Sequence, residues 1–402
     1  MTRRIAFVTT ARSDYNTMFP VMRMAQQDPG IEALIFCAAM HLVPAFGETW
    51  RQLEDDGLVI AEKVDFLSDS DRPEDFSAGL GKGVAAFTAA LVRQAPDIVC
   101  VSGDRLENLA LFVATTTLGI PVAHMCGGDI TEGALDNQVR HVMTKLSHLH
   151  FVSMPEHARR VIQMGEEPWR VTLTGDAAID AIVEQPKLSR AALNERIGLT
   201  DEAPFFLSTF HPETLGDGRA EEQYACLLDA LAEVPERPVM MRPNIDPGFQ
   251  PLVNMLDAFQ SRRPDAIVRT SFDRVTFYAL MAHARFMVGN SSSGLWEAPS
   301  FELPAVNVGG RQAGRVRGQN VLDVSGTDPG QMAEALQKAR SPAFREGLSG
   351  MKNPYGDGQA SRLTLETLKS VPLDSRLTLK KFHEIDFDAL ALGLGLNARE
   401  DT

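Results

Sequence analysis

The chain has 402 residues and a formal net charge of −14, with 44% hydrophobic and 23% charged residues. This length exceeds what one hydrophobic core usually supports, so two globular domains are expected. The negative charge repels nucleic acid, no apolar run is long enough to span a membrane, and the first apolar run is too short for a signal peptide. We therefore expect a cytoplasmic protein that binds neither nucleic acid nor membranes.

Short apolar segments alternate with longer helical patterns in the first half of the chain. The segments are rich in β-branched residues and most end in Gly, Ser or Thr, as buried strands of a parallel sheet do. Strands are expected at 4–10, 33–38, 97–103, 120–125, 149–153 and 171–175. The motif GLGKGV at 79–84 lacks the spacing of a phosphate-binding P-loop and follows no strand, so we expect it inside a helix.

The alternating pattern restarts after Gly175. Further strands are expected at 204–210, 237–243, 266–270, 285–290 and 303–308. Two such series predict an α/β fold with two doubly wound, Rossmann-like domains facing across a cleft. The expected ranges are 1–175 for the N-terminal domain, 176–375 for the C-terminal domain and 376–402 for a C-terminal extension. For the extension, a helix and a loose tail remain open.

A serine-rich turn follows the expected strand at 285–290. The candidate phosphate-binding residues are Ser291, Ser292, Ser293 and Gly294. Free N–H groups at a helix start favour a phosphate, and small hydroxyl side chains let it approach closely. Glu297 lies about one turn later and could accept hydrogen bonds from both hydroxyls of a ribose. The alternative is a helix capped by serine that binds no ligand.

Arginines follow two other expected strands. Arg311, Arg315 and Arg317 lie among glycines after the strand at 303–308. Arginine in this position fits forked contacts to phosphate, although one or two of the three are expected to be solvated. Arg12 directly follows the first strand, where it could reach a diphosphate.

Acidic side chains and a histidine also follow strands. Asp104 comes after the strand at 97–103, and His211 comes after the strand at 204–210. Because ligands of doubly wound sheets bind at the carboxyl ends of strands, these residues are candidates for chemistry. A histidine in this place is often structural, bonded to the backbone, and that alternative stays open.

The segment 124–151 combines glycines, acids and histidines. Asp129 and Asp136 are its candidate acids, and Asp136 begins a helical pattern. The expected buried face of this helix is Val139, Val142, Met143, Leu146 and Leu149. The opposite face, expected to be solvated, holds Arg140, His141, Lys145 and His148. No acidic ligand lies at suitable spacing beside these histidines, so neither a metal ion nor another cofactor is expected.

Taken together, these residues resemble the UDP-N-acetylglucosamine 2-epimerase family, and specifically its hydrolysing branch in sialic and legionaminic acid synthesis. The motifs that carry the resemblance are TTARSDY, AAMHLVPAFGETW, GDRLE, HMCGGDITEGALDNQVRHVMTKLSHLHF, TGDAAID, TFHPET, GNSSSGLWEAPSF and VNVGGRQAGRVRGQNV. They occur in this order over most of the chain. The resemblance implies the GT-B arrangement of two domains, with the nucleotide bound mainly by the C-terminal one. It also implies a homodimer or homotetramer.

The resemblance assigns roles to particular residues. The three serines would hold the diphosphate of a UDP-sugar, or of a GDP-sugar, with help from Arg12 and Arg311, and Glu297 would hold the ribose. The catalytic groups would be Asp104, Asp136 and His211. The substrate would be UDP-N-acetylglucosamine or a diacetylbacillosamine analogue, converted through a glycal into the free 2-epimeric sugar.

Cys126 departs from the family pattern, because related enzymes often have an acid–base glutamate there. A thiol with a pKa of about 8.5 replaces it poorly. Either Asp129 or Asp136 does that work, or the sugar differs, or activity is reduced. Three other functions stay open: a non-hydrolysing epimerase, a GT-B glycosyltransferase and an inactive sugar-nucleotide sensor.

Overall fold

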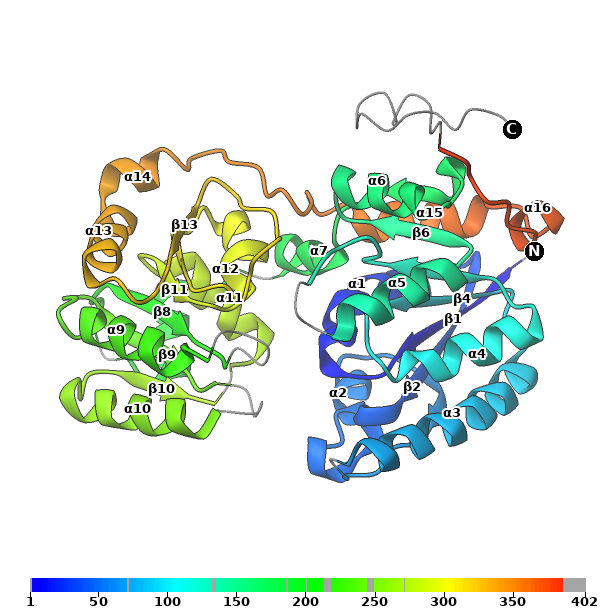
Figure 1. Ribbon diagram of the computed structural model, residues 1–402, viewed down its shortest axis with the longest axis horizontal. Coiled ribbons are helices and arrows are strands. Elements are labelled where there is room, and N and C mark those ends of the chain that lie inside the picture. The colour runs from blue at the N-terminus through cyan, green and yellow to red at the C-terminus, as the bar shows by residue number, and fades with distance from the viewer. Residues whose placement is uncertain are drawn as a thin grey trace, which may run out of the picture. The chain divides into compact units, whose positions relative to one another are not determined.

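The computed structural model describes residues 2–70, 72–131, 135–185, 187–199, 201–212, 218–243, 249–270 and 272–385. The chain forms two compact units (Figure 1). The first unit contains Met1–Asp129, Gln138–Gly175 and the segment that starts at Ser361, and the second contains Ile130–Asn137 and Asp176–Ala360. Residues 386–402 of the expected extension lie outside the described residues.

The first unit is built on a seven-stranded parallel sheet with the order β3-β2-β1-β4-β5-β6-β7. Its strands are β1 (Arg3–Thr9), β2 (Ile31–Ala38), β3 (Ile60–Val64), β4 (Ile98–Ser102), β5 (Val122–Met125), β6 (Leu149–Val152) and β7 (Val171–Leu173). Its helices are α1 (Arg12–Gln27), α2 (Trp50–Asp55), α3 (Pro73–Gln94), α4 (Asn108–Leu118), α5 (Leu135–Leu146), α6 (Pro155–Gln163), α15 (Ala360–Ser370) and α16 (Ser375–Thr378), with short 3₁₀ turns η1 (Ala39–Leu42), η2 (Pro44–Phe46) and η3 (Pro168–Arg170). The GLGKGV motif lies inside α3, as predicted.

The second unit repeats this plan with a six-stranded parallel sheet of order β10-β9-β8-β11-β12-β13. Its strands are β8 (Phe205–Thr209), β9 (Arg237–Met241), β10 (Ile267–Arg269), β11 (Met287–Gly289), β12 (Ala305–Val308) and β13 (Val321–Val324). Its helices are α7 (Ala177–Glu184), α8 (Arg190–Ile197), α9 (Ala220–Ala232), α10 (Phe249–Arg262), α11 (Arg274–His283), α12 (Ser293–Trp296), α13 (Pro329–Arg340) and α14 (Pro342–Glu346), with the 3₁₀ turn η4 (Ala298–Phe301). The predicted α/β class with two doubly wound sheets is confirmed.

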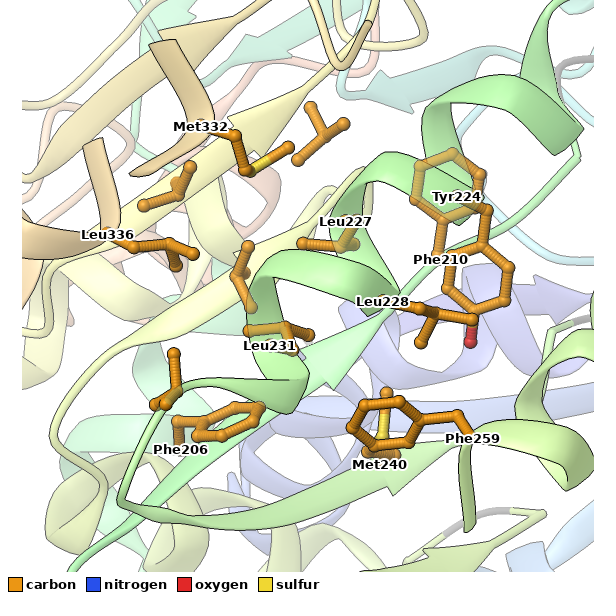
Figure 2. Close-up of a cluster of buried hydrophobic side chains, with 14 of the residues drawn as sticks. Phe206, Phe210, Tyr224, Leu227, Leu228, Leu231, Met240, Phe259, Met332 and Leu336 are labelled. Carbon is orange, nitrogen blue, oxygen red and sulfur yellow. The ribbon is translucent and has the colours of Figure 1, made fainter. Parts of the chain in front are cut away.

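Apolar side chains fill the space between sheet and helices in each unit. Figure 2 shows the larger cluster of the second unit, where α9 and α13 pack their leucines and methionine against the sheet. The rings of Phe210 and Tyr224 stack there at 4.8 Å between centroids. Burying such large aromatic and aliphatic side chains is the main favourable term in holding the helices on the sheet. Among the described helices, none combines the length and apolar character that crossing a bilayer requires.

Two edge strands, β3 and β13, were not predicted. Only Val64 of β3 and Val324 of β13 are buried, and both strands contain charged residues. An edge strand has a partner on one side only, so its sequence need not be apolar throughout. The continuous apolar runs that reveal central strands are therefore missing here.

The segment 361–375 belongs to the first unit, so its predicted place in the C-terminal domain is wrong. Lys369 Nζ lies 2.7 Å from a carboxylate oxygen of Asp28. The buried guanidinium of Arg170 donates to the carbonyl of Leu377 at 2.9 Å. Such contacts with distant residues, which no local sequence pattern reveals, fix the C-terminal segment on the first unit.

Candidate active site

Each sheet has one point where the strand order reverses: between β1 and β4 in the first unit, and between β8 and β11 in the second. Connections leave such a pair of strands toward opposite faces, which opens a crevice at their carboxyl ends. Four predicted site residues lie directly after these strands. They are Arg12, Asp104, His211 and Ser291.

In the first unit, Asp104 forms an ion pair with Arg140 of α5. The side chain of Arg140 is 4% exposed, that of Asp104 is 25% exposed, and Arg140 Nη1 also donates to the carbonyl of Asp129 at 3.0 Å. The predicted solvated position of Arg140 is therefore wrong, as is the predicted burial of Val142, which is 47% exposed. Arg140 lies three residues before the buried Met143, hence on the same helix face, and a buried cation requires an opposite charge.

The turn after β5 has an unusual backbone. Cys126 adopts a φ of 63°, which L-residues with a side chain rarely do, and its N–H donates to the carbonyl of Phe151 at 3.0 Å. Gly128 also has a positive φ, and a Cβ atom there would lie 2.5 Å from the carbonyl oxygen of His157. Asp129 follows, with Oδ1 3.4 Å from Nε2 of His157. Close packing of this turn on α6 thus sets where Cys126 and Asp129 lie.

Asp136 is the second residue of α5 and is half-buried. It belongs to the short segment Ile130–Asn137, which clusters with the second unit, whereas Asp104 belongs to the first. The helix start predicted at Asp136 is confirmed. A carboxylate in the first turn of a helix is favoured by the positive end of the helix dipole.

Three histidines of segment 124–151, His124, His148 and His150, have structural partners. His124 donates from Nε2 to the carbonyl of Gly103 at 2.7 Å, and burial lowers the pKa of His124 to about 3. His148 Nδ1 accepts from the N–H of Val122, and His150 Nε2 lies 2.9 Å from Glu166. These imidazoles therefore brace the strands and the turn that precedes Asp104.

A buried carboxylate shapes the turn after β1. Asp14 accepts hydrogen bonds from the hydroxyl of Thr9 at 2.7 Å, from the hydroxyl and N–H of Thr10, and from the N–H of Ala11. Burial raises the pKa of Asp14 against the lowering effect of these donors. Four donors on one carboxylate hold the turn in a single conformation, which presents the exposed Arg12 at the start of α1.

In the second unit, Asn290 links the residues at the strand ends. Its side-chain oxygen accepts from the N–H of His211 at 2.7 Å, and its amide donates back to the carbonyl of His211 at 2.8 Å. The carbonyl of Asn290 accepts from Gln312 at 2.9 Å and from Arg311 at 3.2 Å. His211, Arg311 and the serine turn are thereby brought together, and the contributions of Asn290 and Gln312 were missed.

His211 is held as a neutral imidazole. Burial, with the nearby positive charge of Arg311, lowers its pKa to about 4. A neutral imidazole can donate one hydrogen bond and accept one, but it brings no positive charge. Near neutral pH, the positive charge at this strand end comes from Arg311.

The serine turn precedes a helix of only four residues, α12. Ser291, Ser292 and Ser293 are partly exposed, and Ser291 Oγ accepts weakly from the N–H of Ser293 at 3.4 Å. Gly294 is buried. So short a helix has a weak dipole, and phosphate binding here would depend on the hydroxyl and N–H groups themselves.

Glu297, directly after α12, has a strongly perturbed carboxyl. Burial, reinforced by the carboxylate of Asp176, raises the pKa of Glu297 to about 7. Its Oε2 atom is buried with no hydrogen-bond partner among the described residues. The other two predicted arginines have structural contacts: Arg315 lies over the ring of Trp296 at 4.4 Å, and Arg317 pairs with Asp323.

Known proteins share sequence similarity with this chain over most of its length. The family model for UDP-N-acetylglucosamine 2-epimerase matches residues 23–369. The chain belongs to this family. A relative from Legionella pneumophila, named UDP-N,N'-diacetylbacillosamine 2-epimerase (hydrolyzing), is 30% identical over 94% of this chain and 99% of its own length. A relative from Campylobacter jejuni, named GDP/UDP-N,N'-diacetylbacillosamine 2-epimerase (hydrolyzing), is 31% identical over 93% of this chain and 97% of its own.

Solved structures of 2-epimerases share the fold. The UDP-GlcNAc 2-epimerase from Neisseria meningitidis, solved with UDP-GlcNAc, has a TM-score of 0.72 and 19% identity, and the match covers 91% of this chain and 99% of that one. The enzyme from Methanocaldococcus jannaschii also has a TM-score of 0.72, with 16% identity and coverage of 92% and 100%. In both matches the shared fold covers more than nine tenths of this chain.

Proposed function

We propose that this member of the 2-epimerase family is a hydrolysing sugar-nucleotide 2-epimerase. The substrate class is a UDP-linked 2-acetamido sugar, and the products are the free 2-epimeric sugar and UDP. Two relatives of nearly full length carry the word hydrolyzing in their names, which supports the choice of reaction. The N,N'-diacetylbacillosamine sugar in both names favours a substrate with a second acetamido group at carbon 4, on the route to legionaminic-type acids.

The observation that carries the proposal is the division of site residues between the two switch points. The first unit has the carboxylate of Asp104 on a buried guanidinium, and the second has the serine turn beside Arg311 and His211. An acetamido sugar nucleotide has a hydrogen on sugar carbon 2 for the first group to remove and a diphosphate for the second group to bind. We assign Asp104 and Asp136 to the sugar and the serine turn, Arg311 and Glu297 to the nucleotide.

The reaction removes the proton from sugar carbon 2 and breaks the bond from carbon 1 to the diphosphate oxygen, which leaves a 2-acetamidoglucal and UDP. Water then adds its oxygen to carbon 1, and a proton returns to carbon 2 from the opposite face. Inversion therefore requires an acid–base group on each face, for which we propose Asp104 and Asp136. Arg311 and the neutral His211 would stabilise the charge that develops on the departing diphosphate.

Cys126 follows β5, at a position where the family resemblance implies an acidic residue, and its side chain faces the hydroxyl of Ser102, with 3.7 Å between Oγ and Sγ. We propose that Asp136, or Asp129 in the same segment, performs the acid–base work instead. The contact of its Oδ1 atom with Nε2 of His157 makes Asp129 the less available of the two.

The test is incubation of the purified protein with UDP-N-acetylglucosamine, UDP-N,N'-diacetylbacillosamine and the GDP form of the latter, followed by NMR. Free 2-epimeric sugar plus nucleoside diphosphate supports the proposal, and the substrate turned over fastest identifies base and sugar. An equilibrium between two intact sugar nucleotides would instead show a non-hydrolysing epimerase. Tight UDP binding without turnover of any substrate would show a sensor.

A further inference from the structure

The C-terminal strap, residues 374–385, is held on the first unit by buried polar contacts. Asp374 caps α16 through the N–H of Arg376 at 2.9 Å. The guanidinium of Arg170, 1% exposed, donates to the carbonyls of Arg376 at 2.8 Å and Leu377 at 2.9 Å. Beyond these, the N–H of His383 donates to the carbonyl of Gly165 at 2.9 Å. A chain segment fixed at several points in this way has a defined course rather than that of a loose tail.

Lys380 connects the strap to the end of α5. Its ammonium donates to the carbonyl of Lys145 at 2.7 Å and to that of Ser147 at 2.6 Å. These carbonyls lie in the last turn of the helix and just beyond it, where backbone oxygens lack helical partners and the dipole favours a cation. Lys380 thus acts as a C-terminal cap that a distant part of the chain supplies.

The ammonium of Lys380 also contacts a buried carboxylate. Glu166 lies 2.8 Å from Lys380, 2.6 Å from Lys145 and 2.9 Å from His150. The side chain of Glu166 is fully buried and that of Lys380 only 20% exposed. Burial alone would raise the pKa of Glu166, but hydrogen bonds from His150, Lys145 and Lys380 lower it to about 2. Burial lowers the pKa of Lys380, and the hydrogen bond and negative charge of Glu166 act against this lowering. The contact between the two side chains is shielded from water.

The same helix positions the candidate catalytic carboxylate. Arg140, one turn and a half before the capped end, forms the ion pair with Asp104. Thr144 approaches Nδ1 of His124 at 3.3 Å, and His124 in turn holds the carbonyl of Gly103, the residue before Asp104. Displacement of the helix end would therefore move both groups that orient Asp104.

We propose that Lys380 is a positioning residue for the reaction: by capping α5 it fixes the Arg140–Asp104 pair, so the C-terminal strap is part of the catalytic apparatus. This inference rests on the proposed function. Lys380 touches neither of the proposed catalytic aspartates and acts only through the helix. Its removal should therefore lower the rate of the chemical step and leave nucleotide binding, assigned to the second unit, unchanged.

The test compares full-length Lys380→Met with two matched variants. Lys381→Met removes the neighbouring exposed lysine, and Lys380→Arg keeps a cation that can donate to both carbonyls. The chain should still fold with methionine at 380, because Glu166 keeps its contacts with Lys145 and His150. The measurements are kcat for sugar release, UDP affinity by calorimetry and amide hydrogen exchange in peptides from 138–147.

For Lys380→Met we expect faster exchange in this helix and a kcat reduced on the order of 10- to 100-fold, with unchanged UDP affinity. Lys381→Met should resemble the wild type, and Lys380→Arg should recover most of the rate. Wild-type exchange and kcat in Lys380→Met would overturn the inference. An equal loss of kcat in Lys381→Met would also overturn it. So would a loss of UDP binding together with kcat in Lys380→Met, because that result indicates general unfolding. If the wild type releases no sugar, the proposed function fails, and exchange in α5 alone then decides whether Lys380 caps the helix.

Discussion

At the scale of single residues, ionisation of Glu297 makes the stability of the second unit depend on pH. The pKa of this carboxyl is raised from an ordinary 4.5 to about 7. Between these two pH values the carboxyl is ionised in the unfolded chain but still protonated in the folded chain. Stability contributed by Glu297 is therefore present below pH 4.5 and lost as the pH rises through 7.

The variant Glu297→Gln tests the predicted loss of stability with rising pH. The amide does not ionise, so the variant should gain stability over the wild type between pH 5 and pH 8, on the order of 1–3 kcal/mol. Urea unfolding of both proteins at the two pH values measures the difference. A difference between the proteins that does not change with pH would contradict the assigned ionisation. Loss of UDP affinity in the same variant would support the ribose contact.

Asp104 is the residue on which the proposed chemistry depends most. Replacing it with asparagine keeps the shape but removes the acid–base group, so kcat should fall on the order of 10²- to 10⁴-fold with little change in UDP affinity. Coupled detection of UDP release measures the rate. Asp65→Asn, at an exposed aspartate of the same unit, is the control and should retain wild-type turnover. An active Asp104→Asn enzyme would exclude Asp104 from the chemical step.

Cys126 is proposed to be dispensable for proton transfer. Serine has nearly the same size and removes the thiol, so Cys126→Ser should retain most of the turnover. Steady-state rates at neutral pH decide whether the thiol or a neighbouring aspartate transfers the proton. A loss as large as that expected for Asp104→Asn would show that the thiol takes part in acid–base chemistry, and would transfer to Cys126 the role here given to the neighbouring aspartates.

At the scale of elements, the turn after β5 depends on close packing against α6. Gly128 and Gly119 both have positive φ, but a Cβ at Gly128 would lie 2.5 Å from a backbone oxygen, whereas none of the described atoms lies within 4 Å of a Cβ at Gly119. The two glycines therefore separate the cost of left-handed backbone from the cost of a clash.

Gly119→Ala should destabilise the protein by about 1 kcal/mol, the cost of placing a side chain at positive φ. Gly128→Ala should cost more than about 2 kcal/mol, because the turn or α6 must also move. Chemical denaturation of the two variants side by side measures both values. Equal destabilisation would mean that the turn yields easily and that packing on α6 does not fix Cys126 and Asp129.

The central strands and the residues that follow them could be predicted because a buried parallel strand is a continuous apolar run and its end is marked by small or polar residues. The edge strands β3 and β13 could not be predicted, because a strand paired on one side only can contain both charged and apolar residues. On α5, the buried stripe at Val139 and Met143 was predicted correctly. The burial of Arg140 was not, because it depends on a counter-charge 36 positions away in the chain.

At the scale of the whole molecule, the proposed catalytic and nucleotide-binding residues are divided between two units of the same plan. The family match runs through both units, from residue 23 to residue 369, and includes most of α15, which follows the second unit in sequence but packs on the first. The chain thus returns to its first unit after completing the second. Deletions that appear to remove only a tail would therefore remove part of the unit that carries Asp104.

The central claim is that the protein breaks and remakes the bond between carbon 2 and hydrogen while releasing the nucleotide. Turnover of a UDP-linked 2-acetamido sugar in D₂O, followed by NMR, tests it most directly. We predict free sugar of inverted configuration with deuterium at carbon 2, together with UDP. Released sugar that keeps its original hydrogen at carbon 2 would contradict the account, since elimination through a glycal could not then have occurred.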